Sequence, residues 1–244
     1  MPHNAATGIE LTGAGYAIAG QTILSGLTLS LTQRRIGIVG RNGSGKTTLL
    51  RLMAGLIAPT VGSVTVSGVD PAADRRAMLT QIGILFQNPD HQILFPTVGE
   101  ELAFGLRQLG QPVGTAEATV RTALAAAGRS HWHGAATHTL SQGQRHYLCL
   151  LAVLLMEPQI ILLDEPFAGL DLPTQMRLAR RLAGLSQQII TISHDPAAVA
   201  DADRVIWLDG GRVRADGPAE QVLAKFRAQM QHLGEADADT DISG

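Results

Sequence analysis

The hydrophobic positions follow two spacings along the chain, and each spacing predicts a different kind of element. Short apolar runs bounded by glycine or polar residues are typical of strands, whereas apolar residues three or four positions apart are typical of helices. We therefore expect strands at residues 9–12, 26–31, 35–39, 63–66, 82–86, 160–163, 188–193 and 204–208. The helices are expected at residues 46–55, 98–109, 117–127, 141–156 and 173–185.

The order of these elements predicts the fold class. Two short antiparallel strands open the chain, and apolar strands then alternate with helices, which favours a mainly parallel sheet covered on both faces. We predict an α/β fold in one domain over residues 1–234, with an N-terminal antiparallel β subdomain and a helical subdomain at about residues 88–158. Residues 235–244 carry four Asp or Glu and little to bury, so we expect a disordered acidic tail.

Composition narrows the classes of function. Hydrophobic residues make up 45% of the 244 residues and charged residues 16%, which is typical of a globular chain with a large core. The 19 Lys and Arg against 21 Asp and Glu give a net charge of −2, which does not favour nucleic acid as a partner. The single Cys149 excludes an internal disulfide and is expected to be a core thiol. No signal peptide or membrane-spanning run is apparent, so we expect the chain alone to be soluble.

The strongest chemical signal is the segment Gly40-Arg-Asn-Gly-Ser-Gly-Lys-Thr47, here called the phosphate loop. Its pattern predicts backbone N–H groups that surround phosphates, with the positive end of the following helix behind them. Lys46 is expected to reach the β- and γ-phosphates of ATP, and the Thr47 hydroxyl to ligate Mg²⁺. A glycine-rich turn with a chance lysine is the alternative, which the flanking strand and helix disfavour. The predicted nucleotide contacts here are Gly40, Arg41, Asn42, Gly43, Ser44, Gly45, Lys46, Thr47 and Thr48.

An acidic pair follows the apolar run at residues 160–163. Asp164 is expected at the C-terminal edge of the sheet, where ligands of open α/β folds bind, and there it would contact the nucleotide's Mg²⁺. Glu165 is placed to polarise the attacking water. An acidic turn that only caps the next helix is the alternative interpretation.

With the segment Leu140-Ser-Gln-Gly-Gln144, the chain resembles the nucleotide-binding subunit of an ATP-binding-cassette transporter over nearly its whole length. The segment is similar to the family signature Leu-Ser-Gly-Gly-Gln, which completes the ATP site of the opposite subunit. The resemblance implies a P-loop NTPase core and ATP contacts from Ser141, Gly143 and Gln144. Gln142 departs from the pattern, which suggests altered packing against nucleotide rather than loss of function, because Ser141 and Gly143 remain. Ser141 can also be a helix N-cap, with Gln144 closing a capping box.

The resemblance implies roles for further residues. Gln87 would sense the γ-phosphate, ligate Mg²⁺ and touch a membrane partner, residues 168–171 would cross a dimer interface, and His194 would be the switch histidine. Tyr16 would stack on adenine, although it could equally be a core strand residue, and a lone His194 at a strand end could be structural. The implied catalytic residues are thus Lys46, Gln87, Glu165 and His194, and the implied Mg²⁺ ligands are Thr47, Gln87 and Asp164.

Residues 86–98 and 100–105 are similar to the energising subunits of energy-coupling-factor importers, which take up vitamins and transition-metal ions. The resemblance implies a short helix and groove for a transmembrane partner, with Asp90, Gln92 and Phe95 at the interface; an ordinary surface loop is the alternative. Residues 31–39 and 140–145 most resemble the biotin-importer branch. Cobalt or nickel import is the close alternative.

Three non-transport branches of the family are alternatives to an importer. Chromosome-maintenance heads need long heptad arms and ribosome-acting types need two cassettes, and neither feature is present. A soluble iron–sulfur assembly ATPase remains the alternative.

The resemblance also implies partners. They are a second ATPase subunit, as a homodimer or with a paralogue, a transmembrane coupling protein and a substrate-binding membrane protein. They would hold the chain at the cytoplasmic face of the membrane. His131, His133 and His138 form a local His-rich stretch, but no acidic residue or Cys lies at a zinc-like spacing from them, which disfavours a metal site there.

Overall fold

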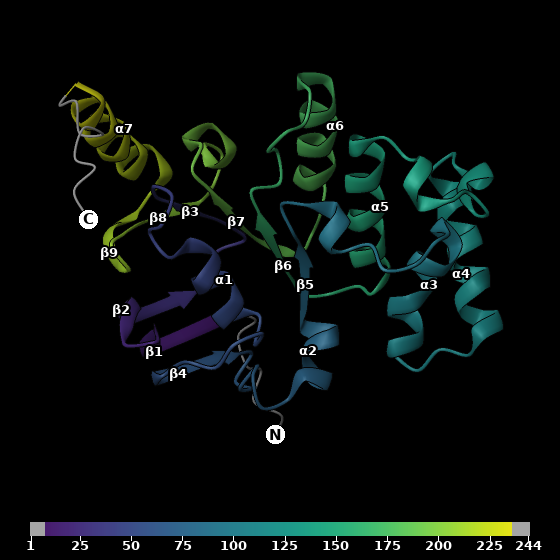
Figure 1. The fold of residues 1–244 in the computed structure, drawn as a ribbon, viewed down its shortest axis with the longest axis horizontal. Coiled ribbons are helices and arrows are strands. Elements are labelled where there is room, and N and C mark those ends of the chain that lie inside the picture. The colour runs from purple at the N-terminus through teal and green to yellow at the C-terminus, as the bar shows by residue number, and fades with distance from the viewer. Residues whose placement is uncertain (1–7, 236–244) are drawn as a thin grey trace.

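The computed structural model describes residues 8–235, which form two sheets and several groups of helices (Figure 1). The larger sheet has six strands in the order β5-β6-β7-β3-β8-β9. Its first five strands run parallel, and β9 pairs antiparallel with β8 at the edge. The strands are β3 (Arg35–Val39), β5 (Ile82–Leu85), β6 (Ile160–Asp164), β7 (Gln188–Ser193), β8 (Arg204–Asp209) and β9 (Arg212–Gly217).

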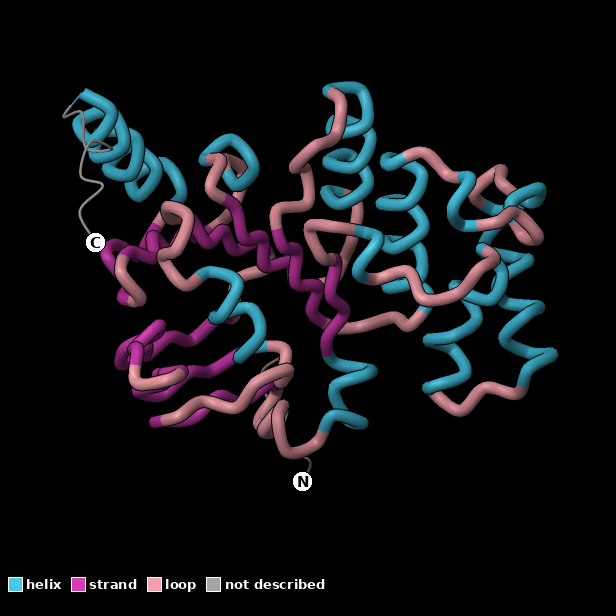
Figure 2. Tube along the Cα trace, in the orientation of Figure 1, coloured by secondary structure: helices cyan, strands magenta, loops and turns pink. Residues whose placement is uncertain are grey.

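The central strands are buried at almost every position because both faces of the sheet are covered. All five residues of β6 are buried, and β3 and β7 each contain one half-buried residue. A parallel sheet with helices on both faces loses the usual alternation of polar and apolar positions. Figure 2 shows these strands as a band through the middle of the molecule, and the predicted fold class is confirmed.

The smaller sheet is antiparallel, with strand order β2-β1-β4. Its strands are β1 (Ile9–Ile18), β2 (Gln21–Leu31) and β4 (Val61–Val66), and the first two are longer than the sequence predicts. The reason is that β1 continues through Gly13, which has φ 57° and lies between irregular pairings. Glycine supports such a bulge inside a strand, so its presence gave a false signal of a strand end.

Helix α1 (Lys46–Met53) lies between the two sheets. Leu49, Leu50, Leu52 and Met53 are fully buried, and they join a core cluster that contains residues of both sheets. The helix is therefore held on several sides, and the phosphate loop at its N-terminus has a fixed position.

Three helices gather beside the central sheet and share a core of their own (Figure 1). They are α3 (Val98–Gln108), α4 (Val113–Ala126) and α5 (Gln142–Leu155). The short 3₁₀ helix η1 (Pro89–His91) precedes α3, and η2 (Ser130–Trp132) and η3 (Thr137–Thr139) lie between α4 and α5. Helix α4 begins four residues before the predicted start, because Gly114 and Thr115 are weak helix formers that hid its first turn. These helices lie within the predicted helical region, whose boundaries at about 88–158 remain a prediction.

The remaining helices are α2 (Arg75–Gln81), α6 (Leu172–Ala183), η4 (Pro196–Val199) and α7 (Ala219–Glu235). The sequence prediction omitted α2, α7 and strand β9. Val222, Leu223 and Phe226 of α7 pack on Trp207 of β8, and their helical spacing was a usable signal. Strand β9 has no buried run to reveal it. Glu235 is the last residue of α7, and the rest of the predicted acidic tail lies outside the described residues.

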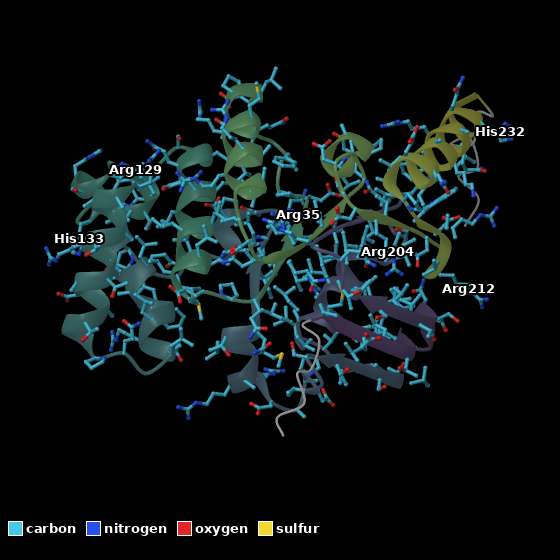
Figure 3. All side chains as sticks on the ribbon, turned by 180° about the vertical axis from the view of Figure 1, so that it is seen from behind. Arg35, Arg129, His133, Arg204, Arg212 and His232 are labelled. Atoms are coloured by element: carbon cyan, nitrogen blue, oxygen red, sulfur yellow. The ribbon has the colours of Figure 1, made fainter. Side chains whose placement is uncertain are left out.

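Arg35 fixes the start of β3 against the end of α6, and Figure 3 shows it near the middle of the molecule. Its guanidinium donates hydrogen bonds to the carbonyl oxygens of Leu185 at 2.6 Å, Gln187 at 2.7 Å and Leu182 at 3.3 Å. These carbonyls belong to the end of α6 and to the turn before β7. Arg35 thus sets the strand that leads to the phosphate loop relative to the helix that follows Glu165.

Candidate functional site

The phosphate loop leaves β3 and enters α1 through glycines in the left-handed region. Gly43 has φ 78° and Gly45, the N-cap of α1, has φ 97°. Residues with a Cβ pay steric energy in this region, so glycine is favoured at both positions. A Cβ on Gly40 would lie 2.2 Å from the carbonyl oxygen of Leu208, so the loop is seated directly on β8.

Lys46 curls back over the phosphate loop. Its Nζ donates to the carbonyl oxygens of Gly40 at 2.8 Å and Arg41 at 3.0 Å, and the residue is buried. Burial lowers the pKa of the Lys46 ammonium, while the charges of Glu165 and Asp164 act in the opposite direction. The Ser44 hydroxyl is buried without a hydrogen-bond partner. A buried cation and an unpaired hydroxyl in a glycine cradle are the donor set that suits phosphate oxygens.

Asp164 and Glu165 end strand β6 beside this loop. Burial raises the pKa of the Asp164 carboxyl, the neighbouring Glu165 raises it further, and Lys46 and Arg51 lower it. Glu165 has φ 48°, a left-handed conformation that costs a non-glycine residue on the order of 1 kcal/mol. Its backbone N–H donates to the carbonyl of Ile192 on β7 at 2.9 Å, which helps to hold this conformation.

The Glu165 carboxylate is oriented by the end of the neighbouring strand β7. Ser193 Oγ donates to Glu165 Oε2 at 2.7 Å, and the backbone N–H of His194 donates to Oε1 at 2.8 Å. The His194 ring nitrogen Nδ1 lies 2.8 Å from the same Oε1. Because a carboxylate only accepts, Nδ1 carries the hydrogen of this contact. Ser193 was not singled out from the sequence, although its place just before His194 at a strand end was a usable signal.

The structure brings Lys46, Asp164, Glu165 and His194 together at the C-terminal ends of β3, β6 and β7. Other predicted site residues lie nearer the surface. Thr47 is exposed on the first turn of α1, and Gln87 is exposed two residues after β5. Tyr16 lies in β1, where it is half-buried and packs against the main core cluster. That position fits the core-residue alternative as well as an adenine contact.

The loop after Gln87 is tied to its surroundings by polar contacts. Gln92 donates from Nε2 to the carbonyl of Ile84 at 3.3 Å and accepts from the N–H of Phe86 at 3.2 Å, so its side chain secures the end of β5. Asp90 pairs with Arg145 of α5 at 3.2 Å. Leu94 in the same loop is 68% exposed, which leaves an apolar side chain available on this face.

The same loop carries an aromatic pair. The Phe95 ring stacks on Phe104 of α3 with centroids 5.1 Å apart. Of the three interface candidates, Gln92 is thus engaged within the loop, Asp90 is paired across to α5 and Phe95 is packed on α3.

The signature segment, residues 140–144, begins helix α5 with a capping box. Ser141 Oγ accepts from the N–H of Gln144 at 3.3 Å, and Gln144 Oε1 accepts from the N–H of Ser141 at 2.7 Å. The unusual Gln142 turns towards the loop at residues 168–171, because its Nε2 lies 2.9 Å from where a Cβ on Gly169 would be. Gln142 thus has a contact within the chain, and altered packing against nucleotide stays a prediction.

Within one chain the signature segment and the phosphate loop border different cavities. Ser141, Gly143 and Gln144 line a cavity of about 840 Å³ between α5 and α6, and none of its lining residues comes from residues 40–47. Gly40 and Asn42 instead border a cavity of about 520 Å³ with His194. The two predicted halves of an ATP site are thus separate in a single chain.

Two further features bear on the kind of protein. Among residues 8–235, His, Cys, Asp and Glu side chains form no group of three or more that could bind a metal ion. In the same range of residues, the helices lack the length and apolar character needed to cross a membrane.

A glycine cradle with a buried lysine, beside an acidic pair at the carboxyl edge of a parallel sheet, defines a phosphate-loop nucleoside triphosphatase. Residues 24–168, more than half of the chain, match the family model described as ABC transporter, and the chain belongs to this family. It is an ATP-binding subunit that hydrolyses ATP to drive transport, as the sequence predicts.

Three known proteins illustrate the likeness. The chain is 53% identical over 219 residues to the biotin transport ATP-binding protein BioM of Rhodobacter capsulatus, which covers 90% of this chain and 94% of BioM. It is 39% identical over 232 residues to the nickel import ATP-binding protein NikO of the same organism, covering 88% and 91%. The structure of cbiO1 from Clostridium perfringens, part of the ABC transporter complex cbiONQ, superposes with a TM-score of 0.77 at 28% identity, covering 93% and 95%.

Proposed function

We propose that this chain is the ATPase subunit of an energy-coupling-factor importer that takes up biotin. The observation that carries the proposal is the 53% identity to BioM over 94% of that protein. Nickel or cobalt is the second candidate cargo, supported by the 39% identity to NikO and the likeness to cbiO1. The cassette itself does not choose the cargo, which falls to a substrate-binding membrane protein.

ATP binds with its phosphates in the phosphate loop, and Lys46 turns from the loop carbonyls to the β- and γ-phosphate oxygens. The unpaired Ser44 hydroxyl and the buried ammonium of Lys46 support this assignment. Thr47, Asp164 and Gln87 are the residues that would hold Mg²⁺. When bound, Mg²⁺ compensates the negative charge that develops on the phosphate oxygens. Tyr16 is assigned to the adenine ring.

Glu165 orients and polarises the water that attacks the γ-phosphate. Ser193 and the His194 backbone hold its carboxylate at 2.7 and 2.8 Å, so the group is positioned before the substrate arrives. The His194 ring donates to the same carboxylate through Nδ1. When the ring carries a hydrogen on both nitrogens, Nε2 donates to the γ-phosphate. The reaction needs mainly positioning and charge compensation, and these residues supply both.

Two chains form a homodimer that encloses two ATP molecules. Each ATP lies in the phosphate loop of one chain and contacts Ser141, Gly143 and Gln144 of the other, because these groups are apart within a single chain. ATP favours the closed dimer and hydrolysis reopens it. The motion passes to a transmembrane coupling protein through the loop at residues 86–96, with Asp90 and Phe95 at that contact. The chain is thereby held at the cytoplasmic face of the membrane.

The variant Glu165→Gln tests the catalytic assignment. It should keep ATP binding and the fold, because glutamine preserves the side-chain volume, but steady-state hydrolysis should fall by at least about 100-fold. Hydrolysis is measured by phosphate release, and ATP-trapped dimers by gel filtration. Glu117→Gln is the matched control, since Glu117 is an exposed residue on α4 paired only with Arg121. Undiminished hydrolysis in Glu165→Gln would remove Glu165 from the mechanism.

Uptake assays test the cargo. The chain, co-expressed with its transmembrane partners in cells that lack biotin uptake, should support accumulation of labelled biotin, and Lys46→Ala should abolish it. Accumulation of nickel or cobalt in place of biotin would establish the second candidate. Co-purification with soluble scaffold proteins alone would instead indicate iron–sulfur assembly.

A further inference from the structure

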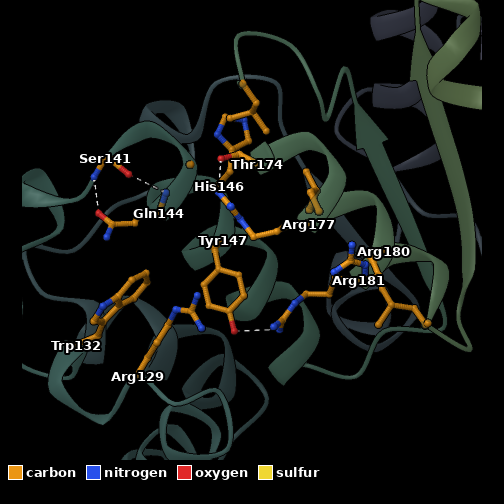
Figure 4. A pocket seen from close by; sticks show the side chains of 15 residues that line it. Arg129, Trp132, Ser141, Gln144, His146, Tyr147, Thr174, Arg177, Arg180 and Arg181 are labelled. Atoms are coloured by element: carbon orange, nitrogen blue, oxygen red, sulfur yellow. Dashed lines mark hydrogen bonds between the residues drawn. The ribbon is translucent and has the colours of Figure 1, made fainter. Parts of the chain in front are cut away.

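A cavity of about 840 Å³ between α5 and α6, here called the arginine cavity, is unusually rich in positive charge (Figure 4). Four arginines line it, and its lining contains no Asp or Glu. One arginine comes from the segment before η2 and three from α6. The four are Arg129, Arg177, Arg180 and Arg181.

Three of the four guanidinium groups are held in place by neutral partners. Arg129 and Arg181 lie over the Tyr147 ring, with their Cζ atoms 4.3 and 4.5 Å from its centroid. Arg181 also donates to the Tyr147 hydroxyl at 2.9 Å, and Arg177 to Thr174 Oγ1 at 2.7 Å. The ion pairs found within residues 8–235 include none of the four arginines. Three of the four guanidinium groups are therefore held in place without an ion pair, and the Asp171 carboxylate acts electrostatically on Arg177.

A buried histidine in the same wall has a free ring nitrogen. His146 is 1% exposed, and its Nδ1 lies 3.2 Å from the carbonyl oxygen of Gln142. A carbonyl oxygen only accepts, so Nδ1 carries the hydrogen and Nε2 is an acceptor in the neutral ring. Nε2 is buried without a hydrogen-bond partner. Buried polar atoms are rarely left unpaired, which points to a ligand in the cavity.

We propose that the arginine cavity binds a small phosphate-bearing anion of up to nucleotide size. Guanidinium forks match the geometry of phosphate oxygens, and four of them line a cavity whose wall contains no carboxylate. His146 Nε2 can accept from a hydroxyl of the ligand. The proposal goes beyond the ATP site of the proposed function, because the four arginines belong to neither the phosphate loop nor the signature segment, although Ser141, Gly143 and Gln144 line the same cavity.

A bound anion would join two parts of the fold. Arg129 precedes η2 beside α4, whereas Arg177 and Arg180 lie on α6 next to the central sheet. Ser141 and Gln144 line the same cavity. An anion that bridges these arginines therefore fixes the junction of α5 with α6, where the signature segment lies, and acts as a regulatory ligand of the ATPase.

The experiment is calorimetric titration of the Lys46→Ala variant with inorganic pyrophosphate and, separately, with AMP, both without Mg²⁺. Removal of Lys46 weakens the phosphate loop as a competing anion site, and the arginine variant and its control separate binding in the arginine cavity from the anion binding that the loop retains. Adding Arg177→Gln and Arg180→Gln should weaken binding at least about tenfold. Both side chains are exposed and lie off the Tyr147 stack, so the fold should persist, as circular dichroism will verify.

The matched control adds Arg75→Gln and Arg212→Gln to Lys46→Ala, which removes the same charge elsewhere on the surface. Figure 3 shows Arg212 at the opposite end of the molecule from Arg129. Binding that survives in this control and is lost in the Arg177→Gln, Arg180→Gln variant supports the proposal, and the tighter of the two anions identifies free phosphate or a nucleotide as its source. Absence of binding at millimolar ligand, or equal loss in both variants, would overturn it.

Discussion

Glu165 illustrates how a single residue at the site depends on distant parts of the chain. The sequence places an acidic pair after an apolar strand, and this was enough to single out Asp164 and Glu165 as candidates. Its left-handed backbone and its contacts to Ser193 and His194 could not be predicted, because they exist only when β6 and β7 are neighbours in the sheet. The local sequence is enough to suggest the chemical role of Glu165, but the orientation of its side chain depends on the tertiary structure.

Cys149 gives a prediction that depends mainly on the burial of its thiol. Burial raises the pKa of the thiol from its ordinary value of 9.0 to about 12, and the negative charges of Glu101 and Asp90 contribute. At about pH 8 only ~1 in 10,000 such thiols is ionised, against ~1 in 10 for an unperturbed one. We therefore expect negligible labelling of the folded protein by a thiol-specific disulfide reagent at that pH.

The same labelling in denaturant should be fast and should reach one thiol per chain, which controls for reagent quality.

The raised pKa of Cys149 also predicts how stability depends on pH. Above about pH 9 the thiol loses its proton in the unfolded chain but keeps it in the folded chain. The free energy of unfolding should therefore fall as pH rises from 9.0 towards about 12, and less so in Cys149→Ala. Rapid labelling under native conditions would show that Cys149 is not buried as described.

At the scale of elements, α5 links the signature segment to the loop at residues 86–96. Its first turn carries the capping box, Gln142 contacts the loop at Gly169, and Arg145 pairs with Asp90. The capping box was predicted from the sequence, because its two partners are three residues apart. The contacts of Gln142 and Arg145 were not, because they join segments far apart in the chain.

The close contact between α5 and α6 predicts the effect of adding one methyl group. A Cβ on Gly143 would lie 2.9 Å from Thr174 Cγ2, which is closer than real Cβ atoms approach. Gly143→Ala should therefore push the two helices apart and lower the free energy of unfolding by about 1–3 kcal/mol. Chemical denaturation of both proteins measures the change.

Thr174→Ser supplies the test of this mechanism, because it removes Cγ2 and keeps the oxygen that accepts from Arg177. The double variant Gly143→Ala, Thr174→Ser should recover most of the lost free energy of unfolding, a coupling that a double-mutant cycle detects. If Thr174→Ser restores nothing, the steric contact with Thr174 is not the cause of the loss.

At the scale of the whole molecule, the separation of the phosphate loop from the signature segment is the feature with most consequence. The two border different cavities in one chain. In a twofold-symmetric dimer, each site would take its phosphate loop from one subunit and its signature segment from the other. Two differently damaged subunits can then combine to give one intact site.

Mixing Lys46→Ala with Ser141→Arg tests this arrangement. Each variant alone should be inactive, since every homodimeric site carries its lesion. In the mixed dimer both lesions fall in one site and the other is intact, so random pairing should restore up to about a quarter of the wild-type ATPase rate. ATPase activity of the mixture, compared with each variant alone at the same total concentration, measures the effect. A mixture no more active than its components would contradict sites shared between subunits.

The sequence by itself determined the elements whose signals are local. Apolar runs gave the central strands, the glycine spacing gave the phosphate loop, and residue order gave the acidic pair and the capping box, because each depends on neighbours in the chain. Only the tertiary structure decided the strand order, the edge strand β9, the hydrogen bonds that orient the Glu165 carboxylate and the arginine cavity. These depend on which distant segments lie side by side, and that is settled by burial and packing of the whole chain.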